Sequence, residues 1–453
     1  MSGRSIFIYT TVVVVAFLCS CGHRDETNPS SPLMPILETK GYVVPQDSMA
    51  LPVTIKIDEH KWKRVEVSPS KRTLPNSNTF IANTTIKIGL VQDRVSIPGR
   101  DGFVQPVQKT ILVTPGPAPF PDIVAAKPMQ VMDSNPLGFR FFNSQQGLKY
   151  ANIRHLMQDH LGNLWLATIG GFSKYDGKYF SNYQLTKDIS DWSSYIHEDT
   201  SGNIWFGTQK GLVKYDGKTF AYFDDRDGIS PDHLYFVEKS GSIWIAPKSG
   251  GITKLTPVAG QSGWPLRFTS MHFGDKEGFT DQIIDKIYED RAGNRWFLFR
   301  DMMGMIQIKP QVDTGDRSIS FLHFKMPEIL QKNIPEMLED HNGHLWFSGT
   351  GGIWKYEHDS LSFFAYSKSD QDLVAPLLAD QSGNIWCNAY RNGIFRLSLP
   401  REGDDFTFTH LNIQDGLSND RINAILEDQS GNIWIGTDNG LNLYHPKFIT
   451  YLT

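Results

Sequence analysis

The sequence predicts an all-β fold, a seven-bladed β-propeller of four-stranded antiparallel blades, preceded by a proline-rich, partly ordered N-terminal segment. Three observations lead to this prediction. A unit of roughly 45 residues recurs seven times in the 453-residue chain, and a period of about 40–50 residues is typical of propellers and solenoids. Each unit holds four short strand-like runs, which favours the propeller. The 39 Gly, 28 Phe, 16 Tyr and 11 Trp form the aromatic, turn-rich composition of an all-β protein.

Each unit is marked by the pattern Asp-x-x-Gly-Asn-x-Trp, first seen from Asp159 to Trp165. Two copies drift, because Glu238 replaces the Asp of the third copy and His344 replaces the Asn of the fifth. We expect the Asp to accept hydrogen bonds from turn amides and the Gly to adopt a positive φ at low steric cost. The Trp ring on the following strand should fill the space between neighbouring blades. The seven tryptophans, 40, 39, 52, 50, 40 and 48 residues apart, are Trp165, Trp205, Trp244, Trp296, Trp346, Trp386 and Trp434.

The last copy shows the four strand-like runs and raises the question of how the ring closes. Its fourth run, residues 448–452, resembles residues 139–143 in front of the first copy. Eight outer-strand candidates therefore exist for seven blades. We expect residues 139–143 to pair with the last blade, which would tie the two ends together without an exposed edge. Residues 448–452 are the alternative occupant of that place.

An export signal precedes these elements. Arg4 is followed by the apolar run from Ile6 to Leu18, which is shorter than the roughly 20 residues of a membrane span and fits the core of a signal peptide over residues 1–20. The run ends in Leu18-Cys19-Ser20-Cys21, which resembles the bacterial lipobox. This resemblance implies cleavage after Ser20 and lipidation of Cys21. An ordinary secreted protein, cut near the same place, is the alternative.

The polar residues 21–32 are expected to form a flexible tether between the lipid and the first ordered element. Gly22 follows the lipidated position, where an Asp would argue for inner-membrane retention in some bacteria. We therefore expect a cell-envelope lipoprotein that contacts the outer membrane through its lipid anchor. The sequence leaves the leaflet open.

The segment between tether and propeller is rich in proline. Of the 25 prolines, 15 lie within residues 29–136, and proline interrupts the short alternating runs found there. We predict a stalk or a small β module over residues 33–137, and assign residues 138–453 to the propeller. Cys387, the one cysteine left after Cys21 is lipidated, should be a buried and inert thiol.

Composition and motifs exclude several classes of function. A formal net charge of −5 and a pI near 6.2 lack the basic footprint that nucleic-acid binding needs. The sequence holds no Gly-rich phosphate loop, no Gly-x-Ser-x-Gly motif and no Cys pairing. His341-x-x-His344 falls in an expected hairpin turn and lacks the helical geometry of a zinc motif. We assign no catalytic residue, no metal site and no cofactor.

Candidate ligand residues lie in two sets of loops that reach one face of the expected propeller, which we call the loop face. These loops join the second strand of each blade to the third, and the outer strand to the next blade. Loops held by a rigid scaffold commonly carry binding residues. Aromatic rings beside Arg donors and carboxylates suit a polyhydroxylated or acidic sugar. The candidates are Trp192, Arg226, Asp227, Arg300, Tyr390 and Arg391.

The repeats resemble the two-component-regulator propeller repeat, which occurs in periplasmic sensor regions of bacterial hybrid histidine kinases. The stretch from Asp415-Gly416-Leu417-Ser418-Asn419 to Asp438-Asn439-Gly440-Leu441 carries the resemblance, which covers roughly residues 139–453. The fourth copy departs most, with residues 297–304 replacing the usual apolar-Gly-Thr stretch, so we expect a locally irregular blade there. The resemblance implies a ligand-binding, sensor-like module, here as a stand-alone lipoprotein and not a complete transducer.

Three functions remain open from the sequence. The first is a lipid-anchored binding or sensor-like module for a carbohydrate ligand. The second is a scaffold that grips another envelope protein, which would need an apolar surface patch. The third is a propeller enzyme, a lyase or glycan hydrolase, which would need convergent ionisable side chains with perturbed pKa values. Because enzymatic motifs are poor, we favour binding over catalysis.

Overall fold

The structure, a computed structural model, divides the chain into two units, Met1–Arg72 and Thr73–Thr453. The described residues all belong to the second unit. The expected signal peptide, the expected lipidation site Cys21, the expected tether and the run 448–452 lie outside them. The described residues are 77–79, 84–87, 92–96, 107–110, 113, 115–132, 135, 138–184, 195–208, 211–224, 227, 229, 234–247, 251–258, 266–274, 279, 283–300, 304–308, 320–325, 336–357, 360–366, 373–389, 392–399 and 406–445.

Four sheets share one construction, in which four consecutive strands pair antiparallel and a fifth strand from upstream joins the outer one. β-Branched and aromatic residues dominate the strands, and Gly and Asp separate them, as strand and turn preferences require. The strands are β8 (Ile153–Gln158), β9 (Leu164–Thr168), β10 (Gly171–Tyr175), β11 (Tyr179–Tyr183), β12 (Tyr195–Glu198), β13 (Ile204–Thr208), β14 (Gly211–Tyr215), β15 (Thr219–Phe223), β16 (Leu234–Val237), β17 (Ile243–Ala246), β18 (Ile252–Pro257), β19 (Arg267–Phe273), β20 (Ile284–Glu289), β21 (Arg295–Phe299), β22 (Gly304–Ile308) and β23 (Ser320–Lys325).

Two further sheets complete the described fold. One has ten strands and contains two consecutive runs, residues 337–365 and 373–411, joined where Gly349 pairs with Val374. The other joins three strands from the end of the chain to one that precedes β8. These strands are β24 (Met337–Glu339), β25 (Leu345–Thr350), β26 (Gly352–Glu357), β27 (Ser360–Ala365), β28 (Leu373–Ala379), β29 (Ile385–Ala389), β30 (Ile394–Ser398), β31 (Thr407–Leu411), β32 (Ile422–Glu427), β33 (Ile433–Thr437), β34 (Gly440–Tyr444) and β7 (Arg140–Phe142).

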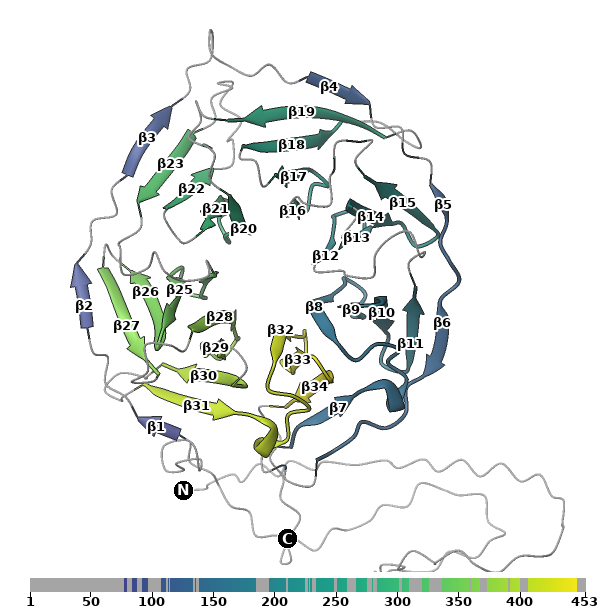
Figure 1. The fold of residues 1–453 in the computed structure, drawn as a ribbon, viewed down its shortest axis with the longest axis vertical. Coiled ribbons are helices and arrows are strands. Elements are labelled where there is room, and N and C mark those ends of the chain that lie inside the picture. The colour runs from purple at the N-terminus through teal and green to yellow at the C-terminus, as the bar shows by residue number, and fades with distance from the viewer. Residues whose placement is uncertain are drawn as a thin grey trace, which may run out of the picture. The chain divides into compact units, whose positions relative to one another are not determined.

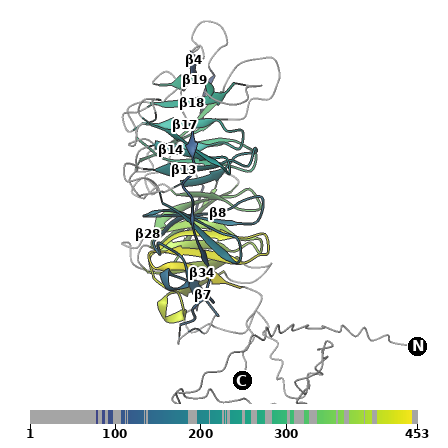
Figure 2. The same cartoon turned by 90° about the vertical axis from the view of Figure 1, so that its right-hand side faces the viewer.

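The sheets lie around a common centre, so the fold is an all-β propeller (Figure 1). The first strands β8, β12, β16, β20, β28 and β32 lie nearest the centre (Figure 1), and the edge-on view shows β17, β18 and β19 at increasing distance from it (Figure 2). Inner strands of neighbouring sheets touch, and β32 of the last sheet touches β8 of the first. The side-chain amide of Asn423 crosses this seam to the carbonyl of Ile153 at 2.9 Å. The ring is therefore closed.

Ring closure follows the expected route. β7 pairs antiparallel with β34, with Phe142 opposite Leu441 and Arg140 opposite Leu443. The prediction that residues 139–143 pair with the last blade is confirmed. Phe142 is 3% exposed and packs among residues of the first and last sheets, so closure also buries apolar surface.

The described residues between 77 and 125 form edge strands on the propeller sheets and not a separate stalk or β module. Residues 33–76 of the segment 33–137, for which a stalk or small β module was predicted, lie outside the described residues. Six short strands follow the rim and pair, in order, with β31, β27, β23, β19, β15 and β11 (Figure 1). Segments rich in proline cannot form central strands, but they can form edge strands. The sequence does not indicate which strands these edge strands pair with. We call residues 77–132 the belt. Its strands are β1 (Ser77–Thr79), β2 (Thr84–Lys87), β3 (Gln92–Ser96), β4 (Val107–Thr110), β5 (Gly116–Pro117) and β6 (Asp122–Ala125).

The repeat motif builds one turn in each of its seven copies. In the first, Asp159 Oδ1 accepts the amide N–H of Leu161 at 3.0 Å and of Asn163 at 2.8 Å, and Gly162 takes a φ of +87°. Asp159 Oδ2 accepts the indole Nε1–H of Trp165 at 2.8 Å. The same bond from indole to motif carboxylate recurs in every copy, at 2.6 to 2.9 Å. The expected roles of the motif residues are confirmed, and the indole bond adds a polar anchor to a buried ring.

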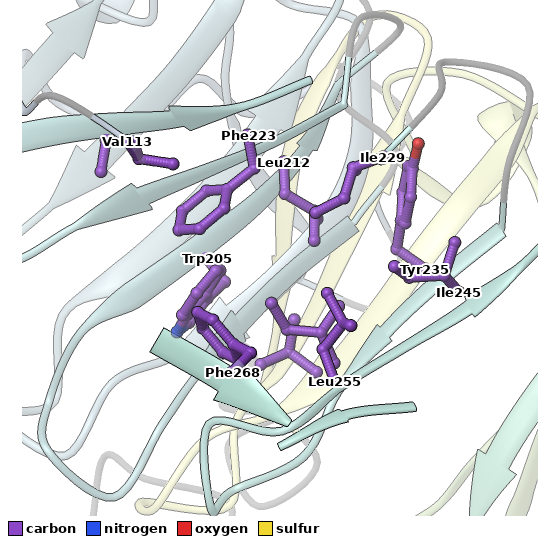
Figure 3. Packing of buried hydrophobic residues seen from close by; sticks show 12 residues of the cluster. Val113, Trp205, Leu212, Phe223, Ile229, Tyr235, Ile245, Leu255 and Phe268 are labelled. Atoms are coloured by element: carbon purple, nitrogen blue, oxygen red, sulfur yellow. The ribbon is translucent and has the colours of Figure 1, made fainter. Parts of the chain in front are cut away.

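The core lies between neighbouring sheets. Trp205, Phe223 and Phe268 pack together between the second and third sheets, and Val113 of the belt joins them at 5% exposure (Figure 3). Cys387 is fully buried beside Trp386 in the ten-stranded sheet, and burial raises the pKa of its thiol. It is the inert core residue that the sequence predicted.

The fourth copy keeps the strand pattern of its neighbours. β21 pairs with β22 from Arg295 opposite Ile308 to Leu298 opposite Met305. The irregularity was expected at residues 297–304; of these, residues 301–303 lie outside the described residues.

Candidate ligand-binding site

Three of the innermost strands carry a β-bulge at the same place in the repeat. The register slips at Arg154 in β8, at Asp285 in β20 and at Asn423 in β32, each five residues before the motif Asp. A bulge leaves its extra residue outside the ladder and re-aims its side chain, and bulges are over-represented beside functional sites. The three side chains therefore belong to the inner edge of the ring, close to the loop face.

Asn423 and Asp438 form a network across the seam between the last and first sheets. Asp438 Oδ1 accepts the side-chain N–H of Asn423 at 2.8 Å and of Asn152 at 2.9 Å. Arg421 NH1 lies 3.4 Å from the second carboxylate oxygen. The Asn152 side-chain carbonyl is buried and has no hydrogen-bond partner in the described part of the chain. Buried acceptors are usually paired, so this carbonyl is an exception within the network.

Asp285 is paired with Arg300, one of the residues expected to contact ligand. Arg300 Nε lies 3.0 Å from Asp285 Oδ2, and Arg300 NH2 lies 2.9 Å from Oδ1, a two-pronged contact. The Arg300 side chain is 50% exposed, so donors remain accessible at this loop. A paired guanidinium held in a fixed plane presents its N–H groups in a defined direction.

The position after two of the three bulges carries a polar residue, His155 in β8 and Lys286 in β20. Lys286 of β20 and Glu336, which precedes β24, form an ion pair with 2.5 Å between Nζ and Oε2. Burial lowers the pKa of His155 in β8 to about 4, with a further lowering by the Lys286 charge and by His197. Lys286 and His155 lie on the innermost strands of two different sheets, β20 and β8 (Figure 1). We call Arg154, His155, Asp285, Lys286, Glu336, Asn423 and Asp438 the inner polar set.

A short aromatic ladder lies beside the inner polar set. The rings of His155 and Tyr195 are 6.1 Å apart, and Tyr195 stacks on His197 at 6.2 Å. Burial lowers the pKa of His197 to about 4, and burial raises the pKa of Tyr195, whose hydroxyl accepts the amide N–H of Val237 at 2.9 Å. His155 Nδ1 and His197 Nε2 are buried without a hydrogen-bond partner among the described residues. Both imidazoles are therefore neutral at physiological pH.

The structure places two of the six predicted ligand residues. Arg300 follows β21 as described above. Asp227 follows β15, is 9% exposed, and accepts the Asp224 amide N–H at 3.2 Å. Gln146 makes the same bond to Asn143 in another connection, so Asp227 closes a turn, and its contact with a ligand stays a prediction. Trp192, Arg226, Tyr390 and Arg391 lie outside the described residues.

Sequence reasoning missed most of the inner polar set. It selected polar residues in loops, whereas Arg154, Asp285 and Asn423 lie within strands. Their common offset of five residues before the motif Asp was visible in the sequence. The bulge that makes this position special was not, because a register slip depends on the partner strand.

Within the described ranges, no group of three or more His, Cys, Asp or Glu side chains is arranged to hold a metal ion. No helix in that part of the chain is long and apolar enough to cross a membrane.

Comparison with known families supports the resemblance noted in the sequence. Residues 416–439 match the two-component regulator propeller repeat. This chain carries that repeat. Among curated proteins, no sequence matches the chain.

Solved structures share the fold. One is the extracellular domain of BT4673 from B. thetaiotaomicron, assigned to a one-component or a hybrid two-component system. It is 16% identical with a TM-score of 0.51, and the match covers 72% of this chain and 41% of that domain. Another is a streptogramin B lyase, 14% identical with a TM-score of 0.51, over 68% of this chain and 97% of the lyase. At these identities the likeness concerns the fold alone, and the chain spans about two fifths of the sensor domain.

Proposed function

We propose that this propeller is an extracytoplasmic, sensor-like binding module that holds a polyhydroxylated, carbohydrate-like ligand at the inner polar set. The observation that supports it best is the set of bulges that turn Arg154, Asp285 and Asn423 out of their ladders at equivalent positions. The repeat at residues 416–439 and the fold of extracellular sensor domains are consistent with such a role.

The chemistry of the set favours a hydroxyl-rich ligand. Its charges are largely paired, as in Lys286 with Glu336 and Arg421 with Asp438, so it offers little excess charge to a strongly ionic ligand. It does offer both donors and acceptors, and the neighbouring Asn152 has a buried carbonyl without a hydrogen-bond partner among the described residues. Paired groups of this kind fix orientation through several hydrogen bonds. The half-exposed Arg300 extends the set towards the loop face.

A thermal-shift assay with neutral and acidic oligosaccharides tests the proposal. A ligand at 100 times its Kd stabilises the folded state by about 2.7 kcal/mol, which raises the midpoint of unfolding. Arg300→Ala should reduce this shift. Lys178→Ala, an exposed residue in the hairpin between β10 and β11, is the matched control and should leave it unchanged. No shift across the panel, or equal losses in both variants, would contradict ligand binding at this place.

We infer that the ring has seven blades. Seven Asp–Trp or Glu–Trp pairs support this number. The ten-stranded sheet holds two of them, at Trp346 and Trp386, on separate runs of strands that pair with each other through β25 and β28. It therefore counts as two blades fused along part of their edges. An experimental density map of the ring, with seven sectors expected, tests the inference; six or eight sectors would contradict it.

We further propose that the chain is a lipoprotein anchored through Cys21, with the outer membrane as its location. The Leu18-Cys19-Ser20-Cys21 pattern behind a short apolar run supports this. Growth with an alkyne-labelled fatty acid should label the wild type, whereas Cys21→Ser should be unlabelled and released from the membrane fraction. Label that persists in Cys21→Ser would place the lipid elsewhere.

The two other functions make different predictions. A lyase or hydrolase would need a general base, but His155 and His197 have pKa values of about 4 and are weak bases at neutral pH. A scaffold would use apolar surface, and Phe120, Ile123 and Val131 of the belt are well exposed. Turnover of an oligosaccharide in the thermal-shift panel would favour the enzyme. Capture of one envelope protein, lost when Phe120 is replaced by Ser, would favour the scaffold.

A further inference from the structure

The belt covers the outer edge of each sheet described. Its six strands pair with β31, β27, β23, β19, β15 and β11, passing the sheets in the reverse of their order along the chain. The remaining edge is that of β7, where Gln130 and Phe141 exchange two backbone hydrogen bonds of 2.8 and 2.9 Å. One continuous segment therefore passes all the outer edges of the ring (Figure 1).

The covered and the covering strands differ in composition. The six covered strands are rich in aromatic residues and carry charge only at Arg267 and Lys325, the ends of two of them. Five- to seven-residue strands with high β-propensity and low charge are the segments that pair readily with other chains. The belt strands are two to five residues long. They include the charged residues Lys87, Asp93, Arg94, Lys109 and Asp122.

The belt strands are themselves poor partners for a further strand, so each sheet ends at the belt. Charge, short length and proline are the devices that keep an edge strand from accepting another strand. Pro117 lies within β5, and Pro115, Pro119 and Pro121 flank β5 and β6. Because proline has no N–H, an incoming strand would find an incomplete ladder there.

We propose that the belt is an edge guard: it occupies outer sheet edges that would otherwise pair with the same edges of a second copy of this chain. The guarded surface is formed by the six aromatic outer strands, and its occupant is the protein's own residues 77–125. This proposal is independent of the ligand proposed above.

The register of β6 on β11 provides a matched pair of variants. Ala126 donates its N–H to the carbonyl of Lys178 at 2.9 Å, and Val124 lies opposite Phe180. Hydrogen-bonded pairs alternate in an antiparallel ladder, so the Val124 N–H also faces β11. The N–H groups of Ile123 and Ala125 face away from it. Two prolines at 124 and 126 break the pairing, whereas two prolines at 123 and 125 leave it in place.

The experiment compares full-length V124P/A126P with I123P/A125P by sedimentation velocity over a concentration series and by hydrogen exchange. In the first variant the amides of Phe180 and Asn182, which face β6, should exchange about tenfold faster or more, and the protein should form concentration-dependent oligomers. The second variant should remain monomeric with protected amides. An excess of a peptide with the sequence of residues 118–128 should return the first variant to monomer.

Three outcomes would overturn the proposal. Fast exchange at Phe180 and Asn182 in a protein that stays monomeric would mean that the uncovered edge does not self-associate. Unchanged protection would mean that β6 is not the group that covers β11. If V124P/A126P does not fold, A118P serves instead, because Ala118 donates its N–H to the carbonyl of Lys218 at 3.0 Å in the next sheet, and the Phe220 amide then reports. If V124P/A126P and A118P both fail to fold while the control I123P/A125P folds, the belt is needed for folding, and the proposal that it prevents self-association is wrong.

Discussion

Glu238 shows how one altered motif residue is compensated in the neighbouring sheet. It stands where other copies have Asp, and its Oε1 accepts the indole N–H of Trp244 at 2.6 Å and lies 3.0 Å from Lys254 Nζ. Its extra methylene also brings the carboxylate to 3.1 Å from Arg295 Nε of the fourth copy. Arg295 occupies a position that is Leu or Ile in the other copies. Burial raises the pKa of Glu238, but these cations and the indole bond outweigh it and hold the pKa below the ordinary value.

Removing the Glu238 charge should therefore destabilise the fold. E238Q removes the carboxylate that Lys254 and Arg295 share, although Arg295 keeps Glu289 Oε2 at 3.5 Å. Breaking a buried ion pair costs about 3–5 kcal/mol. The double variant E238D/R295I restores the combination found in other copies and should recover most of the loss. Free energies of unfolding from urea denaturation give the comparison. Equal stability of E238Q and wild type would mean that the cations are solvated and not paired.

The buried histidines predict a loss of stability in mild acid. Burial lowers the pKa of both His155 and His197 from 6.5 to about 4. Between these values the unfolded chain binds protons that the folded chain does not, so the free energy of unfolding decreases as the pH falls. The exposed His160 has the opposite effect on the free energy of unfolding as the pH falls, because its hydrogen bond to Glu198 raises its pKa.

Urea denaturation at about pH 7 and about pH 4.5 should show this decrease, and H155Q should reduce it by about 2 kcal/mol. H160Q, in the exposed turn between β8 and β9, is the control and should not reduce it. A wild-type protein with equal stability at the two pH values would contradict the neutral state of both buried imidazoles.

At the scale of elements, tight connections position the strands that close the ring. Gly416 ends the short helix Ile413–Asp415 with a φ of +105°. A Cβ there would lie 2.4 Å from Asn135 Oδ1. Asn135 is itself bonded to both the N–H and the carbonyl of Phe139, just before β7. A side chain at 416 would thus disturb the approach of the closing strand.

We expect G416A to destabilise the protein more than G383A. Gly383 also has a positive φ, +84°, but nothing lies within 4 Å of its Cβ position. G383A should cost only the backbone penalty of about 1–2 kcal/mol, and G416A should add the collision with Asn135. Unfolding free energies measure the difference, and the second variant N135A in the G416A background should recover part of it. Equal costs for the two glycines would contradict the contact.

The elements show where sequence reasoning succeeds and where it stops. The turn from Asp159 to Trp165 and the pairing of residues 139–143 were predicted because each depends on local residue types or on counting strands. The belt was not predicted, since β2 pairs with β27 across more than 250 residues and its sequence favours no partner. The inner polar set was missed for a similar reason: the bulge at Asp285 exists only against β21. Contacts set by distant partners leave no local signature.

At the scale of the whole molecule, the first and last sheets are joined by the same kind of contact that joins neighbouring sheets elsewhere in the ring. The amide of Gln429 donates to Gln158 Oε1 at 3.0 Å across the seam. The corresponding amides of His160, at 2.9 Å, and Gln381, at 2.7 Å, donate to Glu198 and Glu427 of the next sheets. The seam therefore resembles the other junctions between sheets. The belt also links the sheets to one another, because its strands pair with the outer strand of one sheet after another. Such a ring should unfold as one cooperative unit.

Cooperativity can be tested with two substitutions on different junctions. Phe142 at the seam is 3% exposed and Trp386 in the ten-stranded sheet is fully buried, and replacing either by Ala should cost about 3–5 kcal/mol. If the ring is one unit, each variant lowers a single transition, with tryptophan fluorescence and far-UV circular dichroism changing together. Leu161→Ala, at a side chain that is 74% exposed, should leave the midpoint unchanged. Two separated transitions in F142A would mean that the first and last sheets open before the rest, and the seam would then be the weak junction of the propeller.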